Sequence, residues 1–277
     1  MKSILVPVED HDRMEGVLET ALVFARKFDS YLEGIPLGPD IAEMVAADFS
    51  MSGVIFDDRT RRAFLRNAAE TFEGFMARKG VPRRSDESKG PSFGWMGEAL
   101  VSPTSVGEYG RVFDLIVVGR PGPASNEPHR STLETALFES GRPLLIAPPE
   151  PATSIGAVVA IIWNGSTETA RSIAFAMPLL KQARDVPVLA VPGLRLPGPT
   201  DAQLARALQR DGIPARVVEV VEGARSPSRA LLAAAADLGA DLIIKGGYTQ
   251  SRIREMIFGG VTSDILAEAM LPVFMAH

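Results

Sequence analysis

The amino-acid sequence repeats itself, and this repeat restricts the fold more than any other feature. The segment Phe113–Gly119 (FDLIVVG) recurs as Ala240–Gly246 (ADLIIKG). Each copy precedes a short apolar segment that begins with proline, Pro143–Ala147 in the first half and Pro272–Ala276 in the second. A length of 277 residues also exceeds that of most domains with a single core. We therefore expect two copies of one small domain.

The apolar pattern of each half predicts alternating strands and helices. The segments Ile4–Val8 and Ala157–Trp163 open the two halves, and their consecutive apolar residues are typical of strands buried on both faces. Between the predicted strands, residues recur at helical spacing. The four predicted helix stripes comprise Met14, Val17, Leu18, Ala21, Leu22, Ala25 and Phe28; Ala170, Ile173, Ala174 and Met177; Leu133, Ala136, Leu137 and Ser140; and Val261, Ile265, Leu266 and Ala269. This order predicts an α/β fold with two tandem doubly wound, mostly parallel five-stranded sheets.

The predicted domains span residues 1–149 and 155–277, and they differ in length at one place. Their first strands start 153 residues apart but their fourth strands only 127 apart, so the first half carries about 26 extra residues. We expect these within Gly34–Asp58, as an inserted loop or short helix near the edge of the sheet that binds ligands. Residues 147–154 are rich in proline and predict a short, stiff linker.

Composition narrows the classes of function. A net charge of −5 argues against nucleic acid and anionic membranes as the main partners. The absence of cysteine excludes disulfides, thiolate metal sites and cysteine nucleophiles. No segment approaches the roughly 20 apolar residues of a membrane-spanning helix, and the first apolar segment is too short for a signal peptide. We expect a cytoplasmic protein.

Candidate ligand contacts lie in three loops of the second half. In an open parallel sheet, ligands bind at the carboxyl ends of the strands, near the point where the strand order reverses. The loops at that edge are Trp163–Ser166 after the first strand, Gly246–Thr249 after the fourth, and Phe258–Thr262 at the start of the last helix. Glycines let backbone amides approach a ligand, and a helix N-terminus favours negative charge. This arrangement predicts an anionic ligand such as a phosphate.

The spacing of these glycines resembles that of the ATP-binding universal stress proteins, whose motif reads Gly-x-x-Gly-x9-Gly-(Ser/Thr). The second half has Gly246-x-x-Thr249-x9-Gly259-Gly260, which keeps the spacing and the first and third glycines. Thr249 replaces the second glycine and adds a side chain where backbone would touch phosphate. Gly260 replaces the hydroxyl residue, and Thr262 would compensate with its own hydroxyl group. The resemblance implies the fold of the adenine-nucleotide alpha-hydrolase-like proteins, with the two domains paired antiparallel through their last strands as an intramolecular pseudo-dimer.

The resemblance also implies an adenine nucleotide, ATP with Mg²⁺, as the ligand of the second half. The expected nucleotide-binding residues are Trp163, Asn164, Gly246, Gly247, Thr249, Gly259, Gly260, Val261 and Thr262. Asn164 stands where the family has an acidic residue that contacts adenosine, and the first half has Glu9 there. In the first half only seven residues separate Gly122 from Arg130, and its loop 121–128 contains three prolines, which lack N–H donors. We expect the first site to be lost.

Several residues have a structural interpretation as well. Gly259–Gly260 is either a phosphate cradle or the loose start of a packed helix. Arg252 and Arg254 either pair with phosphates or lie in solvent. We expect Tyr248 to be a partly exposed loop residue and Trp163 to be a core or inter-domain residue.

The acidic residues after the first strand suggest either a metal site or a helix cap. His11 lies beside Glu9, Asp10 and Asp12. Consecutive acids just after a strand are typical of the N-terminus of the next helix, so we expect a cap and no metal. The sequence offers no assembled catalytic triad, no P-loop and no dinucleotide fingerprint.

These observations leave alternatives for the function. The leading hypothesis is a stress-response or regulatory protein that binds an adenine nucleotide in its second half and responds by changing conformation. An interaction scaffold with decayed pockets is the alternative, and a slow ATPase is a weaker one. Further association of two chains into a homodimer is left open.

Overall fold

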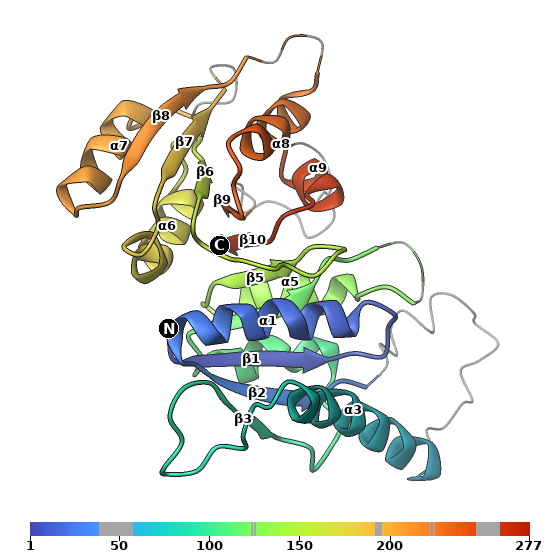
Figure 1. Cartoon of the computed structure of the whole chain (residues 1–277). Helices are drawn as coiled ribbons and strands as arrows, with labels where there is room; N and C mark the ends of the chain where they lie inside the picture. The colour runs from blue at the N-terminus through green and yellow to red at the C-terminus, as the bar shows by residue number, and fades with distance from the viewer. Residues whose placement is uncertain are drawn as a thin grey trace. The chain divides into compact units, whose positions relative to one another are not determined.

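The computed structural model describes residues 1–38, 58–122, 124, 126–191, 196–221, 223, 225–247 and 261–277 (Figure 1). The chain divides into two compact units, residues 1–142 and 143–277. No helix among the described residues combines the length and the apolar character needed to cross a membrane.

The first unit is a parallel sheet with helices between its strands. Its elements are β1 (Ser3–Val8), α1 (Met14–Phe28), β2 (Tyr31–Pro36), α3 (Asp58–Arg78), β3 (Ser92–Trp95), the short 3₁₀ helix η2 (Pro103–Ser105), α4 (Val106–Gly110), β4 (Leu115–Gly119) and α5 (Arg130–Glu139). The strands are ordered β3-β2-β1-β4, and every pair is parallel. The strand order therefore reverses beside β1, because β2 and β4 lie on opposite sides of it.

The second unit has the same alternation of strands and helices. Its elements are β5 (Leu144–Ala147), β6 (Val159–Ile162), α6 (Thr167–Leu180), β7 (Val186–Ala190), α7 (Asp201–Arg210), β8 (Ala215–Glu219), α8 (Pro227–Asp237), β9 (Leu242–Gly246), α9 (Val261–Glu268) and β10 (Val273–Ala276). The strands are ordered β8-β7-β6-β9-β10-β5, and β5 alone runs antiparallel to its described neighbour. Leu145 lies opposite Phe274, and both side chains are fully buried.

The α/β fold and the pairing of the two last strands are thus as predicted. In the second unit α6 and α7 lie on one side of the sheet and α8 and α9 on the other, which makes it doubly wound (Figure 1). The division between the units falls before β5, so segment 143–149 belongs by its contacts to the second unit.

The predicted apolar faces of two helices, α1 and α6, agree with the observed buried residues in one case and differ from them in the other. Helix α1 starts and ends as its apolar spacing predicts, and every residue of its stripe is buried. The stripe predicted for α6 is wrong, because Ala170 and Ala174 are exposed. Ser172 lies on the buried face instead, where its hydroxyl donates to the carbonyl of Lys245 at 3.0 Å and accepts from the amide of Ala276 at 2.9 Å. A serine whose hydroxyl is hydrogen-bonded is stable at a buried position, although a pattern of apolar residues predicts that a serine is exposed.

The repeated aspartates of the sequence motif have a structural role. Asp241 accepts hydrogen bonds from the amides of Gly156, Ala157 and Val158 at 2.9–3.1 Å, at the start of the segment that leads into β6. Asp114 accepts from the amide of Ser3 at 3.2 Å at the start of β1. These carboxylates connect the amino end of the central strand to its neighbour, at the edge of the sheet opposite the carboxyl ends.

The extra residues of the first unit are only partly described. Residues 39–57, most of the predicted insert Gly34–Asp58, lie outside the described residues, and Gly34 itself belongs to β2. Helix α3 has 21 residues, whereas its counterpart α7 has 10. Part of the extra length therefore extends this helix and does not form the predicted loop.

Candidate functional site

The register of the central strands shows which residues of the two units are equivalent. Ile4 pairs with Leu115 in the first unit, and Val159 pairs with Leu242 in the second. Counting along the strands from these pairs, Glu9 is equivalent to Asn164, and Val118 to Lys245. These residues lie at the carboxyl ends of the two central strands, where open α/β sheets bind ligands.

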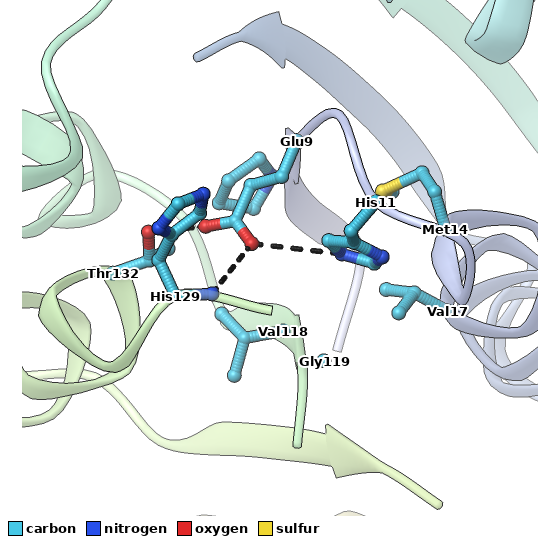
Figure 2. A pocket seen from close by; sticks show the side chains of 9 residues that line it. Glu9, His11, Met14, Val17, Val118, Gly119, His129 and Thr132 are labelled. Carbon is cyan, nitrogen blue, oxygen red and sulfur yellow. Dashed lines mark hydrogen bonds and ion pairs between the residues drawn. The ribbon is translucent and has the colours of Figure 1, made fainter. Parts of the chain in front are cut away.

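The pocket of the first unit is centred on the carboxylate of Glu9 (Figure 2). Glu9 is 7% exposed and follows β1 directly. One of its oxygens accepts from the backbone N–H of His129 at 3.1 Å, and the other accepts from the hydroxyl of Thr132. Both donors belong to the start of α5, where unpaired amides and the helix dipole favour a negative charge. The chain thus places its own anion at the helix end that would face a phosphate.

Glu9 does not cap α1, the helix that follows the acidic cluster. Helix α1 begins after Arg13 and has no side-chain hydrogen bond at its cap. Glu9 acts on α5, 120 residues away, and Asp12 accepts from the side-chain amide of Asn126 at 2.6 Å. The prediction of a local cap is wrong because the parallel sheet brings the loop after β4 beside the loop after β1. Within the described part of the chain, no three acidic or histidine side chains form a metal-binding group.

The imidazole of His11 completes the same cluster. Its Nδ1 accepts from the amide of Arg13 at 3.1 Å, and its Nε2 lies 3.5 Å from a Glu9 oxygen. Burial of the imidazole, assisted by the nearby His129, lowers the pKa of His11 to about 4. His11 is therefore neutral at pH 7, with Nδ1 as acceptor and its proton on Nε2, directed toward Glu9.

We expect stability to fall as the pH is lowered from about 6.5 toward 4. In this window the unfolded chain protonates His11 and the folded chain does not, so acid favours unfolding. Discounted for solvent screening, the loss between pH 7 and pH 5 is on the order of 1 kcal/mol. Urea unfolding at both pH values measures it, and His11→Gln should lose less stability over the same interval. An NMR titration that gives the imidazole an ordinary midpoint near 6.5 would contradict the assignment.

The remainder of the first pocket is filled by the chain itself. A side chain at Gly119 would come within 2.8 Å of the Pro128 ring, which lies directly over this glycine. Glu127 pairs with Arg13 at 2.5 Å and so connects the loop after β4 to the loop after β1. The pocket has no free volume for a water molecule. The loss of the first nucleotide site stays a prediction.

In the second unit, the residues after β6 are held by internal hydrogen bonds. Trp163 is 6% exposed and its indole N–H donates to the carbonyl of Pro199 at 3.0 Å. Asn164 is half-buried, and its side-chain oxygen accepts from the amide of Ser166 at 3.1 Å and the hydroxyl of Thr169 at 2.9 Å. Trp163 is thus a core residue, and the oxygen of Asn164 organises the start of α6.

The two glycines after β9 have different roles. A side chain at Gly246 would clash with the backbone nitrogen of Thr169 and lie 2.7 Å from the carbonyl carbon of Glu168, so this glycine lets β9 pack against the first turn of α6. The amide of Gly247 donates to the carbonyl of Ala276 at 2.8 Å. This amide, expected to face a phosphate, is already used by β10.

The structure adds a residue that sequence reasoning missed. Lys245 is 6% exposed, and its ammonium group donates to the carbonyl of Gly246 at 3.1 Å and to the hydroxyl of Thr262 at the start of α9. Burial lowers the pKa of Lys245 to about 8. The signal lies in the repeat, where Lys245 replaces Val118, but an apolar pattern identifies position 245 only as part of a strand.

The structure brings together only part of the predicted site. Asn164, Gly246 and Thr262 all lie at the carboxyl end of the β6–β9 pair, and Val261 is the first residue of α9. Three of the predicted residues, Thr249, Gly259 and Gly260, lie outside the described residues, as do Tyr248, Arg252 and Arg254. Their roles stay predictions.

Comparison with known proteins addresses the second unit directly. Residues 164–277 match the model of the universal stress protein family. This half of the chain belongs to the universal stress protein family. The universal stress protein domain thus includes Asn164, Lys245 and Thr262, the residues described above. A search of curated proteins by sequence found no match.

Solved structures extend the likeness in fold to the whole chain. A universal stress protein from Archaeoglobus fulgidus DSM 4304 is 17% identical, with a TM-score of 0.67 over 99% of this chain and 95% of that one. A structure from Pseudomonas aeruginosa UCBPP-PA14 is 13% identical, with a TM-score of 0.57 over 100% of this chain and 93% of that one. At these identities the likeness establishes the fold alone.

Proposed function

We propose that the universal stress protein domain of residues 164–277 binds an adenine nucleotide, ATP with Mg²⁺, and that the chain is a cytoplasmic stress-response protein. The first unit is then a second, degenerate copy of the domain, and the chain a covalent pseudo-dimer. The observation that carries the proposal is the family match, which covers the half that retains the glycine spacing from Gly246 to Gly260. In this half the site includes a buried cation, whereas the first unit presents a carboxylate.

Thermal melting of the full chain tests the proposal. A ligand at a hundred times its dissociation constant stabilises the protein by about 2.7 kcal/mol. We expect millimolar ATP with Mg²⁺ to raise the melting temperature. Mass spectrometry of the denatured protein should release co-purified adenine nucleotide. No shift and no released nucleotide would contradict the proposal.

An interaction scaffold is the second candidate function. The filled pocket of the first unit and the engaged amide of Gly247 favour it. A scaffold would show no ATP-dependent shift in either unit. Phosphate release from ATP, measured on the same samples, would distinguish a slow ATPase from a protein that only binds the nucleotide.

A further inference from the structure

Each unit carries one charged residue at two equivalent positions of the site, but the charges differ in sign and stand at different positions. In the first unit the position after the central strand is Glu9, and the position before the strand-ending glycine is the apolar Val118. In the second unit these positions are the neutral Asn164 and the cationic Lys245. Val118 lines the pocket of the first unit, and Lys245 is its equivalent by register in the second unit. One unit therefore contains its own anion, and the other contains a cation.

Among the described residues, the environment of Lys245 supplies no opposite charge. Its two acceptors, the carbonyl of Gly246 and the hydroxyl of Thr262, are neutral. No carboxylate contacts it within the described ranges of the chain. A buried charge without an opposite charge is costly, and proteins retain such groups chiefly at functional sites. An anion at the end of β9 would supply the missing charge.

We propose that Lys245 is the residue with which the second unit binds the phosphate chain of its ligand, with the Thr262 hydroxyl as a second donor. The inference rests on the proposed nucleotide site and names the group that recognises the ligand's charge. The hydroxyl oxygen of Thr262 accepts from Lys245, which leaves the hydroxyl hydrogen to donate to a phosphate oxygen. A compact ammonium group is a common partner of phosphate.

Replacing Lys245 separates this role from a structural one. Lys245→Met keeps the length of the side chain and removes the buried charge, so the ligand-free protein should fold and melt at a higher temperature. Lys245→Gln keeps a hydrogen-bond donor for Thr262 but no charge. Lys181→Met removes an exposed lysine at the end of α6 in the same unit and serves as the control.

Titration calorimetry of the full chain with ATP, adenosine and inorganic tripolyphosphate provides the test. We expect Lys245→Met and Lys245→Gln to weaken ATP and tripolyphosphate binding at least tenfold, and Lys181→Met to leave both unchanged. Wild-type affinity in Lys245→Gln would overturn the inference and leave a hydrogen-bonding role only. If Lys245→Met does not fold, Lys245→Gln carries the same comparison.

The two anions separate this inference from the proposed function. If the wild type binds tripolyphosphate through Lys245 but not ATP, the nucleotide proposal fails and the assignment of Lys245 stands. If ATP binds equally to the wild type and to both Lys245 variants, the nucleotide proposal stands and the assignment of Lys245 fails. Binding of neither anion to the wild type would overturn both.

Discussion

Glu9→Ala is expected to destabilise the first unit by about 3 kcal/mol, because it leaves buried hydrogen-bond donors without an acceptor. The N–H of His129 and the hydroxyl of Thr132 both donate to this carboxylate at the start of α5. The negative charge at the helix N-terminus is lost as well. Urea unfolding, followed by circular dichroism, measures the change in the free energy of unfolding.

Two further variants define the cause of this loss. Glu9→Gln keeps one acceptor oxygen without the charge, so it should cost about 1 kcal/mol, between the wild type and alanine. Asp10→Ala removes the exposed neighbouring carboxylate and should change stability by less than about 0.5 kcal/mol. Equal losses of unfolding free energy in Glu9→Ala and Asp10→Ala would contradict a specific stabilising role of the Glu9 carboxylate at the start of α5.

Gly246→Val is expected to destabilise the second unit by about 3 kcal/mol. The added side chain would overlap the backbone of Glu168 and Thr169 in the first turn of α6, and a helix backbone cannot move aside without shifting the packed helix. Thermal and urea unfolding of the full chain should both detect the loss. Unchanged unfolding would mean that β9 and α6 are less tightly packed than the structure shows.

Gly74→Ala is a matched control for the effect of adding a side chain to a glycine. Gly74 lies within α3, and among the described residues an added Cβ would meet only the guanidinium of Arg78, at 3.6 Å. Alanine should therefore stabilise the chain by about 0.5–1 kcal/mol through helix propensity. Because Gly246→Val perturbs packing, lost ATP binding in that variant would not identify a phosphate contact, and Lys245 is the better position for that purpose.

Local patterns predicted the elements of this fold well where one interaction dominates. The runs Ile4–Val8 and Leu242–Ile244 are buried on both faces of a parallel sheet, so apolarity alone identifies them as strands. The apolar spacing of α1 was likewise sufficient to predict its bounds and its buried face. Apolar spacing did not predict the buried face of α6, because Ser172 owes its burial to hydrogen bonds with β9 and β10.

The candidate site was less predictable because its contacts join distant segments. Glu9 is separated by 120 residues from the amide that it accepts from, and no local pattern connects them. The sequence likewise shows a lysine in an apolar strand at position 245 but not the hydroxyl of Thr262 that it reaches.

The repeat, the α/β class and the family resemblance of the second half all follow from the sequence by itself. Each depends on short-range spacing of apolar residues and glycines, which a linear pattern records. Only the tertiary structure shows which charged groups lie at the carboxyl ends of the central strands in the two units. A parallel sheet gathers the ends of strands that are far apart in the chain, so only the folded protein shows Glu9 at the start of α5 and Lys245 beside Thr262.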